Sequence, residues 1–168
     1  MSVKFIKRLL KHLFIFPNAV RRHFPQNAMR RIETAIAVSE SMHSGEIRFA
    51  VESNLHVLDI FRKKTAKNRA IEVFSQLRVW DTSQNNGVLI YLLLADRDFE
   101  ILADRGIHQH VGNESWEHIS QQMEAMFRQG QFEAGVLFGI AEISEHLAGH
   151  YPLDGENVNE LSDTPVTL

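Results

Sequence analysis

The feature that most constrains this chain is an uninterrupted run of eight apolar residues, from Val88 to Ala95. A run of this length is too short to cross a membrane, which takes about 20 residues in a helix. Its length and the lack of polar alternation instead suit a strand that is buried on both faces. Asn86 and Gly87, directly before it, both tolerate positive φ and mark a turn. The run therefore predicts the central strand of a sheet that is covered on both sides.

The segments around this run set the fold class. Residues 96–98 are polar and predict a short hairpin connection, after which Phe99, Ile101 and Ala103 alternate with outward positions as in a half-buried strand. The same alternation predicts a first strand over residues 46–52. Apolar positions at helical spacing predict helices over residues 26–43, 66–77, 113–129 and 132–148. We therefore expect an α/β fold, a three-layer α/β/α sandwich around a small mixed β-sheet.

The first 24 residues predict a basic amphipathic helix or arm. Residues 1–31 carry eight lysines and arginines and no carboxylate. The apolar side chains of the arm are spaced to share one side of a helix: Ile6, Leu9, Leu10, Leu13, Phe14 and Phe16. Two interpretations follow. The helix packs on the domain and keeps its basic side in water, which we favour, or it makes a peripheral contact with an anionic membrane.

The rest of the chain is acidic, and the whole protein has a formal net charge of −3. An acidic body argues against nucleic acid as a partner, because phosphate contacts need clustered lysine and arginine. Residues 152–168 hold four carboxylates and no basic residue, which predicts a disordered tail. The absence of cysteine excludes a disulfide framework, a thiolate metal site and a cysteine nucleophile.

A polar site is predicted where the central strand begins. Asp81, Asn85 and Asn86 precede this strand, and the hairpin brings Asp104 back to the same end. Carboxylate and amide oxygens are the ligands that Ca²⁺ and Mg²⁺ prefer, so these four residues are the metal-site candidates. Two further residues could hold a ligand there: Arg105 could bind a phosphate group, and Trp80 could stack on a ligand or plug the core. Asp96 and Asp98 lie at the far end of the strand and are expected to be turn residues.

Glu46 and Arg48 point to the same face of the first strand. If that face is covered, both charges need partners, and each could be the partner of the other. A structural ion pair and a pair of charges lining a site remain equal alternatives. His108 and His110 would share a face of an extended segment, a spacing that a metal could use, but surface histidines are the favoured interpretation.

Several blocks of this sequence resemble the TPM domain family. The first is Asn86 to Ile90 followed by Asp96-Arg97, and the next is the strand that ends in Arg105-Gly106-Ile107. A third block, residues 127–136, resembles the pattern between the last helices of the family. The resemblance covers residues 25–151, a TPM-like domain between the arm and the tail. It implies a three-layer sandwich, weak phosphatase activity, divalent cation binding, and help in assembling or repairing membrane complexes.

The sequence departs from this family where a cation site would be built. The usual aspartate before Asn-Gly is Asn85 here, and a glutamate of the second hairpin strand is replaced by Leu102. We therefore expect a non-catalytic binding or assembly module with an unknown protein partner, with a weak phosphatase acting on phosphate esters as the alternative. No leader or membrane helix is recognised, so a cytoplasmic location, in contact with a membrane through residues 1–24 or not, is the expectation.

Overall fold

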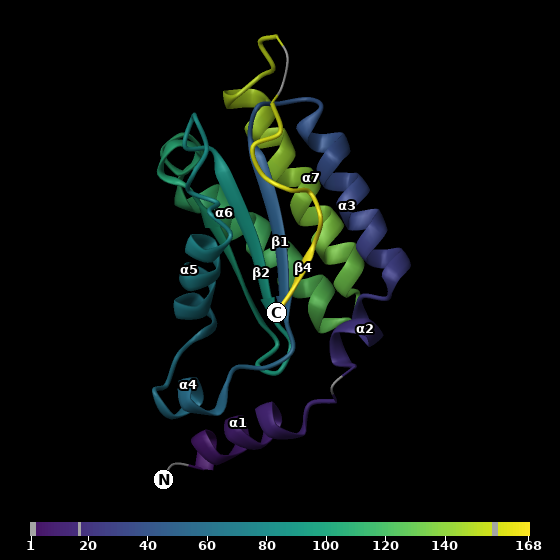
Figure 1. Ribbon diagram of the computed structural model, residues 1–168, viewed down its shortest axis with the longest axis vertical. Helices are drawn as coiled ribbons and strands as arrows, with labels where there is room; N and C mark the ends of the chain where they lie inside the picture. The colour runs from purple at the N-terminus through teal and green to yellow at the C-terminus, as the bar shows by residue number, and fades with distance from the viewer. Residues whose placement is uncertain (1–2, 17, 156–157) are drawn as a thin grey trace.

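The computed structural model describes residues 3–16, 18–155 and 158–168, and its strands form one mixed sheet in the order β3-β2-β1-β4. The elements in chain order are α1 (Val3–Phe14), α2 (Ala19–His23), α3 (Gln26–Glu40), β1 (Glu46–Glu52), α4 (Val57–Phe61), α5 (Ala66–Gln76), β2 (Gly87–Leu93), β3 (Asp98–Ala103), α6 (Arg105–Arg128), α7 (Phe132–His150) and β4 (Val166–Thr167). Helices lie on both sides of the sheet (Figure 1). The α/β sandwich expected from the sequence is confirmed.

The apolar run forms the second strand of the sheet, and every residue of β2 is buried. β1 runs parallel to β2, with Ile47 opposite Val88. β3 runs antiparallel to β2 through the hairpin, with Ala103 opposite Val88. β4 pairs in parallel with the other side of β1, where Ala50 faces Val166. The three strands predicted from the sequence are therefore the interior and one edge of the sheet.

Alternate residues of β1 and β2 enter two separate cores. Ile47 and Ile90 belong to a large cluster beneath α3, α6 and α7, while Ala50 and Tyr91 belong to a smaller cluster beneath α4 and α5. This division follows from the pleat, which points successive side chains to opposite faces of a strand. The sheet is covered on both faces, although Glu46, Arg48 and Glu52 of β1 put buried charges on the same face as Ala50.

The extended segment predicted for residues 107–111 is wrong, because α6 already begins at Arg105. The Asp104 carboxylate caps this helix by accepting a hydrogen bond from the Arg105 N–H at 2.7 Å, and His108 N–H donates to the Asp104 carbonyl at 2.9 Å. Gly112, at φ 76° and ψ 166°, interrupts the helix before Asn113. His108 and His110 are exposed helical residues.

The tail predicted to be disordered is packed along the edge of the sheet. The Glu46 carboxylate accepts hydrogen bonds from the backbone N–H groups of Glu160 at 3.0 Å and Leu161 at 3.1 Å. The chain then continues into β4, and Leu168 N–H donates to the Val51 carbonyl at 3.0 Å. The prediction failed because the partners of this polar segment are distant in sequence. Residues 156–157 of the predicted tail lie outside the described residues.

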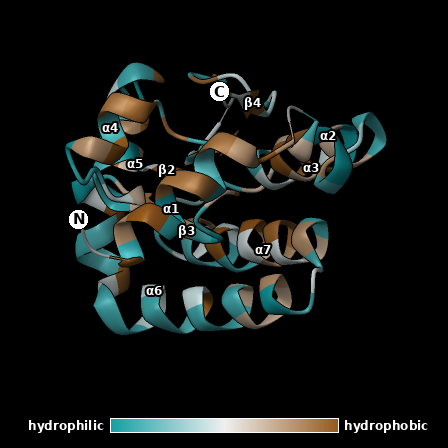
Figure 2. Cartoon of the chain, turned by 90° about the horizontal axis from the view of Figure 1, so that it is seen from below, coloured by the Kyte–Doolittle hydropathy of each residue, from teal (hydrophilic) through white to brown (hydrophobic). Residues whose placement is uncertain are grey.

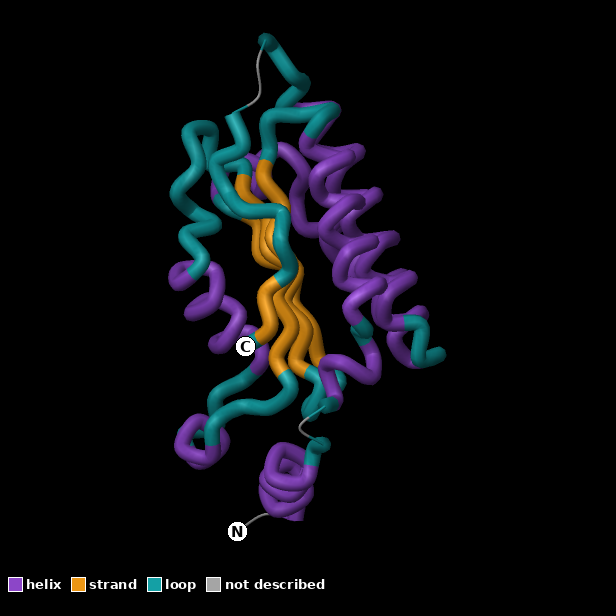
Figure 3. Tube along the Cα trace, turned by 45° about the vertical axis from the view of Figure 1, so that its right-hand side comes forward, coloured by secondary structure: helices purple, strands orange, loops and turns teal. Residues whose placement is uncertain are grey.

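The boundary predicted between an arm and a domain at residue 25 is not a structural boundary. Ala19, Val20 and Phe24 belong to the large core cluster, so the chain before residue 25 is part of the folded unit. α1 lies across the end of the sheet where β1 ends and the β2–β3 hairpin turns (Figure 3). Residues 1, 2 and 17 of the predicted arm lie outside the described residues.

Candidate functional site

Three of the four metal-site candidates meet at the end of the sheet where β2 begins. Asp104 N–H donates to the Gly87 carbonyl at 2.8 Å, which places Asp104 beside the Asn86–Gly87 turn. Ile107 N–H donates to the Asn85 carbonyl at 3.2 Å, so the first turn of α6 rests on the same loop. A Cβ on Gly106 would lie 2.5 Å from the Asn85 carbonyl oxygen. Only glycine allows this approach, which brings Asn85, Asn86 and Asp104 to one place.

Two buried oxygen atoms stand out at this end of the sheet. Asn86 donates its side-chain N–H to the Ser44 carbonyl at 2.9 Å, but its Oδ1 has no hydrogen-bond partner among the described residues. Asp104 uses one oxygen to cap α6, while its Oδ2 is buried and likewise accepts no hydrogen bond from the described part of the chain. Burial and the nearby Asp104 charge raise the pKa of the Tyr151 hydroxyl. The site therefore offers oxygen acceptors that lack donors.

The other candidates do not join these oxygens. Trp80, Asp81 and Arg105 are exposed, and within residues 3–16, 18–155 and 158–168 no hydrogen bond or ion pair connects their side chains to Asn86 or Asp104. The described residues contain no group of three or more histidine, aspartate or glutamate side chains placed to hold a metal. Because Ca²⁺ takes six to eight oxygen ligands, Asn86 and Asp104 make an incomplete set.

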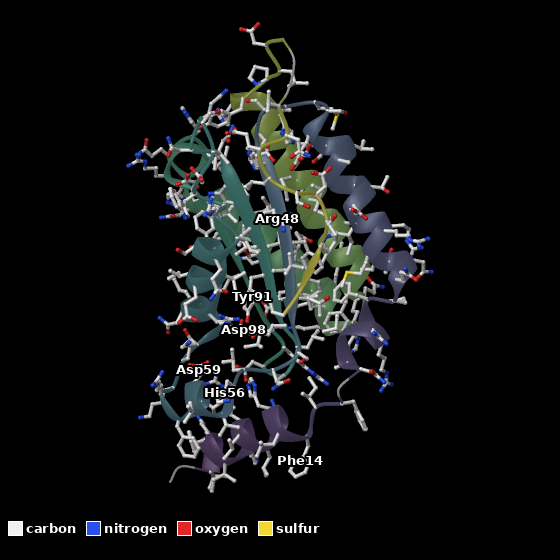
Figure 4. All side chains as sticks on the ribbon, in the orientation of Figure 1. Phe14, Arg48, His56, Asp59, Tyr91 and Asp98 are labelled. Carbon is white, nitrogen blue, oxygen red and sulfur yellow. The ribbon has the colours of Figure 1, made fainter. Side chains whose placement is uncertain are left out.

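Glu46 and Arg48 are buried, as a covered face requires, but no ion pair between them is found in the described structure. Glu46 binds the tail instead. Burial lowers the pKa of the Arg48 guanidinium, and the neighbouring Glu40, Asp163 and Glu46 act against this shift. Figure 4 shows Arg48 on β1 at mid-height of the sheet, near the path of the tail. Of the two charges, Glu46 holds the tail by hydrogen bonds, and Arg48 lies close enough to Glu40, Asp163 and Glu46 to feel their charges.

Glu40 completes this buried group and was not among the sequence candidates. Its Oε1 accepts a hydrogen bond from the Ile47 N–H at 2.8 Å. Burial raises the pKa of Glu40 to about 9, and the charges of Glu46 and Asp163 add to the shift. A signal was present in the sequence, because Glu40 follows the inward-facing Ile32 and Ile36 at intervals of four residues.

The opposite end of the sheet carries a second polar cluster, which fastens α1. Arg8 donates to both carboxylate oxygens of Asp96, at 2.8 Å from Nη2 and 3.1 Å from Nε, and also to the Lys64 carbonyl at 2.6 Å. His12 contacts Asp96 Oδ1 at 3.0 Å through Nε2. Asp96, expected to be only a turn residue, therefore anchors the N-terminal helix.

The His12 ring lies between the backbone of Leu55 and the carboxylate of Asp96 and contacts both. The Leu55 N–H donates to His12 Nδ1 at 2.9 Å, so in the neutral ring the hydrogen sits on Nε2 and is donated to Asp96. Burial raises the pKa of Asp96, but the hydrogen bonds from His12 and Arg8 outweigh this effect and bring it down to about 2. This cluster was not predicted from the sequence, because Arg8 and His12 bind partners that lie 43 to 88 residues away along the chain.

Because Arg8 and His12 bind one side of α1 to the domain, the opposite side of this helix exposes large apolar side chains to solvent. We call this set the α1 stripe: Val3, Ile6, Leu10, Leu13 and Phe14, all classed as exposed. Phe14 is 74% exposed, and it projects away from the molecule (Figure 4). Leu58 and Phe61 of the neighbouring α4 are exposed as well. Viewed from this end, both helices carry hydrophobic segments (Figure 2).

Comparison with known proteins assigns the chain to a family. The family model described as "TPM domain" matches residues 23–146. The chain belongs to the TPM domain family. No match was found among curated proteins. None of the helices in the described residues combines the length and the apolar character needed to span a bilayer.

Solved structures of two bacterial proteins share this fold. The NMR structure of the BA42 protein from the psychrophilic bacterium Bizionia argentinensis is 30% identical, with a TM-score of 0.75. The match covers 84% of this chain and 93% of that chain. The N-terminal domain of a protein from P. gingivalis is 20% identical over 79% of this chain and 83% of its own, with a TM-score of 0.59, and shows the fold alone.

Proposed function

We propose that this TPM-family protein is a non-catalytic binding module that docks on an anionic membrane surface through α1. The α1 stripe is the observation that carries this proposal. Single exposed apolar residues are ordinary, but here five share the outer side of one helix. A surface helix normally buries such a stripe, whereas an interfacial helix inserts it between lipid headgroups.

The anchor of α1 supports the same function. Arg8 and His12 tie the inner side of the helix to Asp96, so the α1 stripe keeps its outward orientation without a membrane. A surface that is already in its binding conformation loses less conformational entropy on binding. The domain would therefore lie on the bilayer in one fixed orientation.

Charge supports an anionic membrane in particular. Lys4, Lys7 and Lys11 are exposed on α1 and lie to one side of the α1 stripe on a helical projection. Each lysine near an anionic surface contributes about 1 kcal/mol to binding, and salt weakens this attraction. The apolar side chains of α4 extend the same surface, because α4 packs on α1 through Phe5 and Phe61, whose ring centroids are 5.4 Å apart.

Vesicle flotation tests this function. The intact protein should bind vesicles of phosphatidylcholine mixed with phosphatidylglycerol, and binding should weaken as salt is raised. The variant Leu10→Gln/Leu13→Gln/Phe14→Gln should lose at least about tenfold in binding, because each buried apolar side chain contributes on the order of 1–2 kcal/mol.

A matched control removes the same number of exposed apolar side chains elsewhere. Val38→Gln/Met42→Gln/Ile71→Gln changes residues of α3 and α5, or next to them, that are between 51% and 57% exposed. This control should bind vesicles like the unchanged protein. No binding of the unchanged protein, or equal loss in both variants, would reject the membrane function.

A cation site is a second proposal, supported by the two buried oxygens of Asn86 and Asp104 that have no donor among the described residues. These two side chains would hold Ca²⁺ or Mg²⁺ together with water, since they supply few ligands. Titration with either ion should raise the melting temperature of the protein, and Asp104→Asn, which keeps the helix cap, should remove the shift. Asp81→Asn, at an exposed position, should leave it unchanged.

The family resemblance adds two expectations to the proposed membrane-docked module. A protein partner would bind the surfaces that remain free when the module lies on the cytoplasmic face of a membrane. Weak hydrolysis of phosphate esters is the alternative to a purely binding function, with exposed Arg105 as the group that could hold the phosphate. Release of nitrophenol from p-nitrophenyl phosphate, lost in Arg105→Gln, would support the phosphatase; no release would leave the binding module.

A further inference from the structure

A cavity of about 740 Å³ opens between the end of α1, α2 and the β2–β3 hairpin. We call it the α1–α2 pocket. The residues that line it include Lys11, Arg22 and Arg97, which are basic, and Ile15, Phe16 and Leu94, which are apolar. Lys11 and Phe14 also belong to the exposed surface of α1, so the pocket lies beside the surface proposed to touch the membrane.

The charges of this pocket are all positive. Lys11, Arg22 and Arg97 line it, and none of its lining residues is acidic. In the described structure these three side chains take part in no ion pair, whereas Arg8 on the same helix is paired with Asp96. Unpaired arginines that share a concave surface are suited to bind an anion, because the guanidinium group matches phosphate oxygens in a bidentate geometry.

The two arginines lie close to a common point. Burial lowers the pKa of His23, and the charges of Arg22 and Arg97 lower it further. His23 is therefore neutral at pH 7, so that the positive charge of the pocket comes from Lys11, Arg22 and Arg97.

The walls of the pocket are apolar. Ile15, Phe16 and Leu94 contribute hydrocarbon surface beside the cations, and a second cavity of about 500 Å³ shares His23, Leu94 and Arg97 with it. That second cavity is lined by further apolar side chains, Leu92, Phe99, Phe127 and Phe132, and by the charged Glu124 and Arg128. An inorganic phosphate would leave these walls exposed to water, whereas an amphiphile would cover them.

We infer that the α1–α2 pocket binds one anionic glycerophospholipid. Arg22 and Arg97 hold its phosphate, and the apolar walls take the glycerol backbone and the start of the acyl chains. This site rests on the proposed membrane function, because α1 brings the pocket to the bilayer surface. It adds recognition of one lipid molecule to the general attraction of lysines to a charged surface. A zwitterionic lipid is disfavoured, since its ammonium group would approach three cations.

Dihexanoylphosphatidylglycerol below its critical micelle concentration tests this site without a bilayer. Calorimetric titration should show binding to the intact protein, and binding at least about tenfold weaker in Arg22→Gln/Arg97→Gln, since a charged hydrogen bond contributes that much. Arg21→Gln/Arg30→Gln, which removes two exposed arginines outside the pocket, should bind like the unchanged protein. Both variants alter exposed positions, and Lys11→Gln is a further single change in the pocket that should weaken binding.

Two more probes test separately whether the pocket requires the negative charge and the acyl chains of the lipid. Dihexanoylphosphatidylcholine should bind at least about tenfold more weakly than dihexanoylphosphatidylglycerol, because it has no net negative charge. Glycerol phosphate should also bind more weakly, because it cannot cover the apolar walls. Equal binding of both lipids, or equal loss in the two double variants, would overturn the site. Vesicle binding without dihexanoylphosphatidylglycerol binding would overturn it too, and would leave the proposed membrane function intact.

Discussion

Two carboxyl groups, the half-buried Asp96 beside α1 and the buried Glu40 beneath the tail, have opposite protonation states. Asp96 holds α1 and has a pKa of about 2, whereas Glu40 lies under the tail and has a pKa of about 9. Burial raises the pKa in both places. Asp96 faces two nitrogen donors, Arg8 and His12, while Glu40 faces the carboxylates of Glu46 and Asp163. At Glu40 burial is the largest cause of the raised pKa and the neighbouring carboxylates add to it, whereas at Asp96 the hydrogen bonds from Arg8 and His12 outweigh the effect of burial.

The largest loss of stability should come from a substitution in the sheet against which both α1 and the tail pack. Leu92→Asp should destabilise the protein by more than about 4 kcal/mol, because it places an unpaired carboxylate in a core where Leu92 is 1% exposed. Circular dichroism during urea unfolding measures this effect. A cooperative transition near that of the unchanged protein would contradict the buried position of β2.

Removing the carboxylate under α1 should have the next largest effect. Asp96→Ala should lower the free energy of unfolding by about 3 kcal/mol, because it leaves Arg8 and His12 without their acceptor. Trypsin should then cut faster at Lys4, Lys7 and Lys11. Asp98→Asn is the control, since within the described part of the chain the Asp98 carboxylate accepts its hydrogen bond from the neighbouring Phe99 N–H.

Lowering the pH should remove the stability that Asp96 contributes at the α1 end of the molecule. Because the pKa of Asp96 is lowered by folding, its contribution is present above the ordinary value of 3.8 and is lost as pH falls towards about 2. The unfolding free energy of the unchanged protein should therefore decrease by roughly 2 kcal/mol over this window. Asp96→Ala should lack that part of the decrease; the same acid dependence in both proteins would contradict the low pKa.

Raising the pH should remove the stability that the protonated Glu40 contributes beneath the tail. Because folding raises the pKa of Glu40 from 4.5 to about 9, the stability linked to its proton is complete below pH 4.5 and is lost as pH rises through about 9. Glu40→Gln keeps an oxygen for the Ile47 N–H and cannot ionise, so it should stabilise the protein by roughly 4 kcal/mol at pH 8 and little at pH 4. Thermal melts at both pH values measure this difference.

A matched carboxyl change shows whether that effect is local. Glu145→Gln, at an exposed position of α7, should leave the pH dependence unchanged. Stabilisation by Glu40→Gln that is equal at pH 4 and pH 8 would mean that Glu40 does not carry the proton, and the contrast with Asp96 would fail.

The smallest effect should come from the exposed contact of the tail. Glu160 accepts hydrogen bonds from the Ser83 N–H and hydroxyl, but its side chain is exposed. Glu160→Ala should therefore cost less than about 1 kcal/mol, since exposed hydrogen bonds compete with water. Hydrogen exchange of the β4 amides should hardly change; a large increase would place the attachment of the tail at Ser83 and not at Glu46.

The core of the fold was predictable from local pattern. The run from Val88, the Asn86–Gly87 turn and the hairpin at Asp96 predicted β2, β3 and their antiparallel pairing, because strand burial and turn chemistry are encoded in neighbouring residues. The convergence of Asn86 and Asp104 followed from the same hairpin geometry. The packing of residues 158–168 was missed, because polar residues without periodicity carry no local signal.

Of the binding surfaces, the sequence alone supplied the amphipathic character of the first helix and its two alternatives. The tertiary structure shows that α1 packs on the domain and still exposes an apolar stripe. Asp96 and Leu55 decide which side faces inward by binding Arg8 and His12 across gaps of 43 to 88 residues. Local sequence determines the periodicity of a helix, but hydrogen bonds to distant residues determine its rotation, and that rotation decides which of its side chains face solvent.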